Sequence, residues 1–187
     1  MSSATSFRDH FLIAMPALSD PNFDHSVTYI CEHNEEGAMG IIINRQMEIT
    51  MEEVLGQMEI EPSNRFDTGQ KIHEGGPVQL EHGFVLHTPV GAWESSLQVG
   101  DDIALTTSRD ILSAIAHGEG PRHYLVALGY AGWGPGQLEQ EMAANAWLSG
   151  PASKRILFEL PIEERWAAAA ALLGIDLNLL SSDIGHA

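Results

Sequence analysis

Apolar and polar residues alternate over residues 26–33, which is the pattern of a β-strand with one buried face. The polar residues 34–37 follow and end in glycine, and the apolar run 38–44 comes next. Two apolar runs separated by such a short glycine-containing loop predict a β-hairpin. Other short apolar runs bounded by turn residues predict strands at residues 71–73, 83–87, 103–106, 124–127 and 156–159.

Four segments have the apolar spacing and the end signals of helices. The first covers residues 50–58, with Thr50 as its cap and Glu53 three positions on, which together form a capping box. The others are predicted from Thr107 to the residue before Gly118, over residues 137–148, and over residues 162–173. Because strands and helices mix without strict β-α-β alternation, the pattern predicts an α+β fold. We expect one compact domain over residues 1–187, with room for two interlocked lobes.

Residues 124–147 are the most informative segment, because they predict a strand, a glycine-rich loop and then a helix. This order often creates an anion site, since the free N–H groups at a helix N-terminus point at the ligand. Here the loop, residues 128–136, contains no Lys, Arg, Ser or Thr, and Glu139 and Glu141 lie in the first turns of the predicted helix. These two carboxylates would repel a phosphate. The segment therefore indicates an architecture but no reaction.

Charge and composition narrow the possible partners. The chain has 187 residues, with 9 Lys and Arg against 26 Asp and Glu, a formal net charge of −17. Such a chain is repelled by phosphate backbones and anionic membranes, so we expect neither direct nucleic-acid binding nor membrane binding. The single cysteine excludes an internal disulfide, and no secretory signal or long apolar run is present, so we expect a cytoplasmic protein.

No arrangement of residues predicts catalysis, a metal or a cofactor. His82 and His87 are five residues apart on a predicted strand and would point to opposite faces, and no second cysteine is available for a zinc site. Cys31 lies next to apolar neighbours and is interpreted as a buried structural residue rather than a nucleophile. We therefore expect no metal site and no cofactor, and we favour a protein that is not an enzyme.

Two segments supply a candidate binding surface. Residues 137, 141 and 145 form a polar stripe at i, i+4 and i+8 of the predicted helix, next to Trp133. This stripe is either a recognition face or an ordinary solvated face. The Gly-Gly-Pro run at residues 75–77 is either a loop held close to a ligand or a turn or bulge, and the turn or bulge is the favoured interpretation. The candidate surface comprises Gly75, Gly76, Pro77, Arg109, Trp133, Gln137, Glu141 and Asn145.

Several longer segments together resemble one known family, and the similarity extends over nearly the whole chain. They are residues 11–16 (FLIAMP), 20–23 (DPNF), 27–40 (VTYICEHNEEGAMG), 75–78 (GGPV), 83–87 (GFVLH), 106–110 (TTSRD) and 129–147. The chain resembles the YqgE/AlgH family of small bacterial cytosolic proteins and is closest to the AlgH branch. At one position it departs from the family, because His82 stands where an arginine usually precedes Gly-Phe.

The resemblance implies an α+β fold with a partly barrel-like β-sheet surrounded by helices. The AlgH name is associated with regulation of alginate production, and the family has no established catalytic residues. Three hypotheses follow. The first is a non-enzymatic cytosolic regulator that binds a protein or a small ligand. The second is a transcriptional regulator that acts directly on DNA, which the charge opposes. The third is a small-molecule-binding enzyme or carrier that uses clefts beside the two glycine-rich segments.

Overall fold

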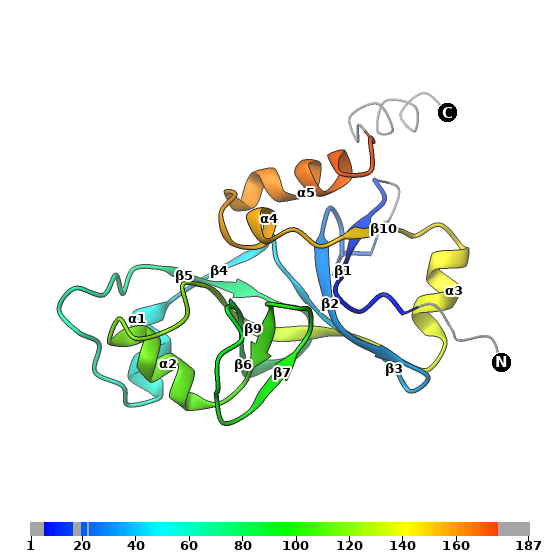
Figure 1. The fold of residues 1–187 in the computed structure, drawn as a ribbon. Helices are drawn as coiled ribbons and strands as arrows, with labels where there is room; N and C mark the ends of the chain where they lie inside the picture. Colours follow the sequence, from blue (N-terminus) through cyan, green and yellow to red (C-terminus); the bar gives the residue numbers. More distant parts are fainter. Residues whose placement is uncertain (1–5, 17–19, 22, 176–187) are drawn as a thin grey trace.

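The protein is built on one strongly curled β-sheet with helices around it (Figure 1). The computed structural model describes residues 6–16, 20–21 and 23–175, and within them it contains ten strands and five helices. In chain order they are β1 (His10–Ala14), β2 (Val27–Asn34), β3 (Gly37–Ile42), β4 (Gln46–Thr50), α1 (Met51–Gln57), β5 (Lys71–Glu74), β6 (Val78–Thr88), β7 (Ser96–Gln98), β8 (Ala104–Thr106), α2 (Arg109–Ala116), β9 (His123–Trp133), α3 (Gln137–Ala143), β10 (Trp147–Pro151), α4 (Lys154–Phe158) and α5 (Ile162–Ala171). The predicted α+β fold with a partly barrel-like sheet is confirmed.

The long strand β9 connects the two halves of the sheet. The strand order is β10-β1-β2-β3-β9-β6-β8-β7, and these neighbours are antiparallel. The first part of β9 pairs with β6, and its last three residues pair with β3. Strand β5 runs parallel to the middle of β9 and pairs with β4 on its other side, which makes the sheet mixed. In Figure 1, α1 and α2 lie beside one half of the sheet and α3 beside the other, while α4 and α5 lie above.

Three apolar clusters hold these layers together. The largest lies inside the curl of the sheet and continues under α4 and α5, with Phe11, Tyr29, Leu86, Leu125 and Ala170 among its members. The second joins α1 and α2 to the outer face of the sheet, and the third packs α3 against the opposite half. The third cluster contains Leu12, Ala14, Ile30, Ala38, Ala131, Trp133, Leu138 and Trp147.

Most predicted local elements are present in the structure. The hairpin of residues 26–44 is β2 and β3, and Glu53 accepts a hydrogen bond from the backbone N–H of Thr50 at 3.2 Å, as a capping box requires. Helix α2 begins at Arg109 with Ser108 as its N-cap, one residue later than predicted. Cys31 is fully buried, and its thiol contacts the Tyr29 carbonyl oxygen at 3.6 Å.

The prediction of a loop over residues 128–136 is wrong for its first part, because strand β9 continues to Trp133. Glycine lowers strand propensity, but it also marks places where a strand bends or another backbone approaches closely. Gly129 has a φ of 78°, and at this point the pairing of β9 with β6 changes register. Only Gly134–Gly136 form the turn before α3, and Gly136 is the helix cap.

Two further element predictions are wrong. The helix predicted over residues 137–148 ends at Ala143, and Trp147 begins strand β10, which pairs with β1 at the edge of the sheet. Burying Trp147 against the sheet outweighs the helical pattern of this segment. The strand predicted over residues 156–159 is helix α4, where the Ser153 hydroxyl accepts a hydrogen bond from the backbone N–H of Ile156 at 3.3 Å.

Candidate binding site

The two glycine-rich segments converge through their backbones. The Gly75 N–H donates to the Leu128 carbonyl at 2.8 Å, and the Gly75 carbonyl accepts from the Ile42 N–H at 2.8 Å. The next residue, Gly76, packs directly on β9, since an added Cβ would lie 2.1 Å from the carbonyl carbon of Tyr130. The Gly-Gly-Pro run is therefore a place of close backbone approach at the start of β6, rather than a simple surface turn.

A cleft of about 920 Å³ opens on the concave side of the sheet next to this junction. The β2–β3 hairpin forms one side, β7 and β8 form the other, and β6 and β9 form the floor. Its lining residues are Glu32, Asn34, Glu36, Gly37, Ala38, Met39, Val78, Gln79, His82, Phe84, Ser95, Ser96, Leu97, Leu105, Thr107, Tyr130, Gly132 and Trp133. We call this space the barrel-mouth cleft. Of the residues predicted from sequence, Trp133 lines it directly, and Pro77 immediately precedes the lining residue Val78.

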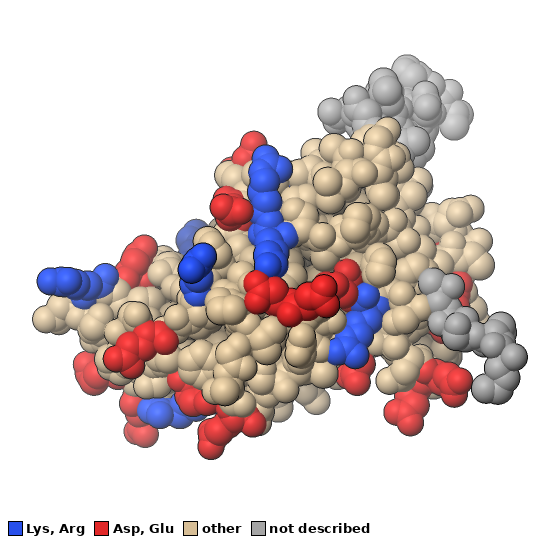
Figure 2. Space-filling model, viewed as in Figure 1, with Lys and Arg blue, Asp and Glu red and all other residues tan. Residues whose placement is uncertain are grey.

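The barrel-mouth cleft combines an apolar floor with an acidic rim. Phe84, Leu105 and Tyr130 are buried or half-buried, whereas Glu32 and Glu36 are exposed at the rim. The lining, as the structure describes it, includes neither lysine nor arginine. Figure 2 shows a similar excess of acidic over basic side chains on one face of the whole molecule, where the blue Lys and Arg residues are fewer than the red Asp and Glu residues. Such a cleft suits a ligand with an apolar body and a positive charge.

The predicted polar stripe on α3 belongs to a hydrogen-bond network that fixes the helix to the sheet. One oxygen of Glu141 accepts from the indole N–H of Trp133 at 3.0 Å and from that of Trp147 at 2.9 Å. Its other oxygen accepts from the Gln137 amide at 2.9 Å. Asn145 lies beyond the end of α3 with a left-handed φ of 60°. The network places Gln137 and Glu141 next to Trp133, whereas Asn145 lies outside the helix and does not continue the predicted stripe. The Glu141 carboxylate already has internal partners.

Arg109 lies away from the barrel-mouth cleft. Its guanidinium donates to the carbonyl oxygens of Met58 at 3.1 Å and Glu59 at 3.2 Å, just beyond the end of α1. Met58 is the C-cap of α1 and Glu59 follows it, so Arg109 binds carbonyls just past the helix and links the end of α1 to the start of α2. This geometry gives Arg109 a structural role.

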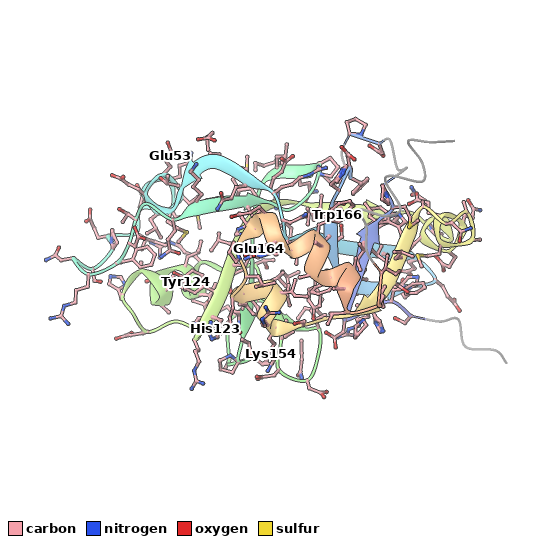
Figure 3. The ribbon with its side chains drawn as sticks, turned by 90° about the horizontal axis from the view of Figure 1, so that it is seen from above. Glu53, His123, Tyr124, Lys154, Glu164 and Trp166 are labelled. Atoms are coloured by element: carbon pink, nitrogen blue, oxygen red, sulfur yellow. The ribbon has the colours of Figure 1, made fainter. Side chains whose placement is uncertain are left out.

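A second pocket, of about 440 Å³, lies between the sheet and α4 and was not anticipated from the sequence. Its lining includes His123 and Lys154, which lie near each other in the view of Figure 3. The Lys154 ammonium is 2.6 Å from a carboxylate oxygen of Asp102, which also accepts from the Thr88 hydroxyl at 2.9 Å. These two bonds hold the pKa of Asp102 below its usual value. Lys154 is therefore already paired.

Buried polar groups anchor α5 to the sheet. The Arg165 guanidinium donates to the Leu160 carbonyl at 3.0 Å and to the Ile43 carbonyl at 2.5 Å, and it lies 3.3 Å from Nε2 of His73. Burial, together with the positive charge of Arg165, lowers the pKa of His73 from 6.5 to about 4. His73 is therefore neutral in the folded protein at pH 7.

We expect this histidine to make the protein less stable in acid. Because the pKa of His73 is lower in the folded state than in the unfolded chain, its contribution to stability is complete above pH 6.5. The contribution decreases as the pH falls through the interval from 6.5 to about 4, by about 3 kcal/mol in all. Urea unfolding of the wild type and His73→Gln at pH 7.5 and pH 4 measures this difference.

The matched control for this measurement is His117→Gln, because His117 is exposed. Carboxylates also titrate in this range, so only the difference between variants is informative. We expect His73→Gln to lose clearly less stability on acidification than the wild type, and His117→Gln to lose the same amount as the wild type. Equal losses in all three proteins would contradict the assignment.

Neither a metal cluster nor a reactive thiol emerges from the described part of the chain. Residues 6–16, 20–21 and 23–175 contain no group of three or more His, Cys, Asp or Glu side chains placed to hold a metal ion. Burial raises the pKa of the Cys31 thiol, so the reactive thiolate is disfavoured. No described helix combines the length and the apolar character needed to cross a membrane.

Comparisons with known proteins agree with the fold and the sequence pattern. A sequence model described as AlgH-like matches residues 11–178. The chain is 59% identical to a UPF0301 protein of Thioalkalivibrio sulfidiphilus and 56% identical to one of Nitrosococcus oceani, with full coverage of both chains in each comparison. It is also 51% identical to the AlgH protein of Pseudomonas aeruginosa, whose solution structure matches with a TM-score of 0.81 over 97% of this chain and 96% of that one.

A more distant structure shows that the fold persists at low sequence identity. A protein of Corynebacterium diphtheriae is 19% identical, and its crystal structure matches with a TM-score of 0.76 over 97% of this chain and 94% of that one. At this identity the similarity concerns the fold alone. Given the family match over most of the chain and the full-length relatives above 50% identity, the chain belongs to the AlgH-like family of UPF0301 proteins, as its sequence motifs indicate.

Proposed function

We propose that this protein is a non-enzymatic cytosolic regulator that binds a partner through the barrel-mouth cleft. The partner group would carry a positive charge on an apolar body. The observation that carries this proposal is the lining of the cleft, in which Phe84 and Tyr130 form an apolar floor and Glu32 and Glu36 stand at the rim, with neither lysine nor arginine among the described lining residues.

The physical argument concerns the free energy of desolvating a charge. An ammonium or guanidinium group that leaves water for a cleft needs a nearby carboxylate, and the rim supplies two. The same two carboxylates would repel a phosphate or carboxylate ligand, and the formal net charge of the chain, −17, adds to this repulsion. The lining thus favours cationic partners over nucleic acids, which supports the first of the three hypotheses over direct action on DNA.

The candidate surface predicted from sequence becomes narrower in this proposal. Trp133 remains part of it because it lines the cleft, and Gly75, Gly76 and Pro77 contribute by setting the position of β6 on the floor. Gln137 and Glu141 act indirectly, by fixing Trp133 in place. Of the eight predicted residues, Arg109 and Asn145 have no role in the proposed site.

Small aromatic amines and carboxylates of equal size test this proposal. We expect benzylamine and tryptamine to shift backbone amide NMR signals of cleft residues such as Gly132 and Tyr130 in a saturable way, and benzoate and indole-3-acetate not to do so. The double variant Glu32→Gln/Glu36→Gln should bind the amines about fivefold more weakly, because an exposed charge pair contributes up to about 1 kcal/mol.

The matched control is Glu35→Gln/Glu119→Gln, which removes the same net charge from exposed residues outside the cleft lining. It should bind the amines as the wild type does. Equal responses to amines and carboxylates, or amine binding that both double variants weaken alike, would refute a cation-selective cleft.

A further inference from the structure

Among the strands of the described residues, β7 (Ser96–Gln98) ends the sheet and is paired on one side only. On that side it pairs with β8, with Leu97 opposite Leu105. Its other side faces the opening of the barrel-mouth cleft, to which Ser96 and Leu97 contribute. An edge strand of this kind is a template for a further strand, because its outward backbone groups can pair with another chain.

The hydrogen bonds around β7 show which backbone groups point outward. The Thr107 N–H donates to the Ser95 carbonyl at 2.9 Å, and the Val99 N–H donates to the Ile103 carbonyl at 2.9 Å, so Ser95 and Val99 face β8. Because backbone groups alternate along a strand, those of Ser96 and Gln98 face away from β8.

One of these outward groups is already occupied. The Gln98 carbonyl accepts a hydrogen bond from the Arg8 guanidinium, which reaches across from the segment before β1. The N–H and the carbonyl of Ser96 lie farther along β7, at the side of the barrel-mouth cleft. Within the described part of the chain, the edge is therefore bridged by a side chain at one end of β7 and unpaired beside Ser96.

An added strand would lie about 4.8 Å from β7 and would project alternate side chains into the barrel-mouth cleft. The residues that face it there are the half-buried Leu97 and Met39 and the rim carboxylates Glu32 and Glu36. Apolar side chains of an added strand would meet the first pair, and lysine or arginine side chains would meet the second. Main-chain hydrogen bonds would supply affinity, and the cleft would supply selectivity.

We propose that the partner of the barrel-mouth cleft is an extended, lysine- or arginine-bearing segment of another protein, which adds to β7 as an extra strand. This inference rests on the proposed function and specifies its binding mode. The basic character follows from charge complementarity with Glu32 and Glu36, and the extended form follows from the outward backbone groups of Ser96. The short length of β7 and the Arg8 contact limit uncontrolled pairing with other edges.

The test uses a blocked heptapeptide with valine at positions 1 and 3, lysine at positions 5 and 7 and serine between them, so that both kinds of side chain lie on one face of the added strand. The same peptide N-methylated at alternate backbone positions is compared with it. N-methylation keeps the charges and side chains but removes the N–H donors that a strand needs. We expect the unmodified peptide to bind in calorimetry and to shift the amide signals of β7. Two complementary N-methylated forms are prepared, one methylated at the odd and one at the even backbone positions. The form methylated on the edge-facing side should bind at least tenfold more weakly.

Two substitutions at one residue test the same point from the protein side. Ser96→Pro removes the outward N–H without breaking a backbone hydrogen bond to β8, so it should weaken peptide binding about tenfold. Ser96→Ala keeps this N–H and removes only the hydroxyl that contacts Thr106 at 2.9 Å, so it should bind the peptide as the wild type does. Amide spectra of both variants show whether the sheet remains folded.

The outcomes separate this inference from the proposed function. Equal binding of the peptide and both N-methylated forms overturns strand addition, while a response to benzylamine leaves the cationic cleft standing. Absence of both peptide and amine binding overturns both proposals. If the protein instead forms dimers that Ser96→Pro abolishes, and the peptide does not bind, the edge belongs to a second copy of this chain and the peptide proposal is wrong.

Discussion

Gly76→Ala should destabilise the protein by about 4 kcal/mol or more. Gly76 has a φ of 156°, a conformation that residues with a side chain rarely adopt. An added Cβ would lie 2.1 Å from the carbonyl carbon of Tyr130 and 2.2 Å from its oxygen. These are backbone atoms of β9, the strand that connects both halves of the sheet, so relief of the overlap requires β9 to move.

Gly56→Ala is the matched control for this prediction. Gly56 lies within α1, and no atom outside its own helix surroundings lies within 4 Å of a Cβ built there. Alanine at this position should stabilise the protein by up to about 1 kcal/mol through its higher helix propensity. Urea unfolding followed by circular dichroism measures both variants. A loss below about 1 kcal/mol for Gly76→Ala would mean that β5, β6 and β9 are not packed as described.

The predictable parts of this fold depend on neighbours in the sequence. The hairpin of β2 and β3 follows from alternation and a short glycine-containing loop, and the capping box of Thr50 and Glu53 lies within one helical turn. Such signals do not depend on the rest of the chain, so the elements they specify can be predicted from the local sequence alone. The α+β class follows in the same way, from the order of the elements.

The glycines were harder to interpret because their partners are distant in the sequence. Gly-Gly-Pro is a common turn signal, and four glycines in residues 129–136 suggest a loop. In the structure, Gly75 and Gly76 allow the start of β6 to lie directly on β9, and β9 remains a strand through Gly129 and Gly132. The role of each glycine-rich segment therefore becomes visible only when the other segment lies beside it in the fold.

The end of α3 depends on tertiary packing, whereas α4 depends on a cap that is next to it in the sequence. The segment after Gln137 has helical spacing through residue 148, yet Trp147 lies in a strand because β1 offers an edge that buries it. The short apolar segment in α4 suits either a strand or a helix, and the Ser153 cap decides for the helix. Short apolar runs carry this ambiguity whenever length and flanking residues do not resolve it.

The candidate site was only partly predictable for a related reason. Trp133 and Glu141 are close in sequence, so their proximity could be expected, whereas the contribution of Trp147 depends on the course of β10. Glu32 and Glu36 look like ordinary solvent-exposed acids of a hairpin. Their position opposite β7 arises only from the curl of the whole sheet.

Glu141→Leu should destabilise the protein by about 4 kcal/mol. One oxygen of Glu141 accepts from the indole N–H groups of both Trp133 and Trp147, and these two side chains are 5% and 3% exposed. Leucine fills a similar volume but accepts no hydrogen bond, so two buried donors lose their partner at about 2 kcal/mol each. Urea unfolding followed by tryptophan fluorescence measures the loss and reports on the same two rings.

Glu141→Gln is the informative control, because it removes the charge but keeps an acceptor oxygen for both indoles. Its amide N–H groups would face the Gln137 amide, which now donates to the second carboxylate oxygen at 2.9 Å, so we expect a smaller loss of about 1 kcal/mol. Comparing the stability losses of the two variants therefore distinguishes the contribution of the indole hydrogen bonds from the contribution of the negative charge. If Glu141→Gln were as destabilising as Glu141→Leu, the negative charge of Glu141 would be the dominant contribution, and the indole bonds would not hold α3 on the sheet. If neither variant changed the free energy of unfolding, the network would not contribute to stability.

If Glu141→Leu is more destabilising than Glu141→Gln, as we expect, Glu141 is the residue that keeps Trp133 at the wall of the barrel-mouth cleft. Glu141→Leu should then also weaken binding of tryptamine there.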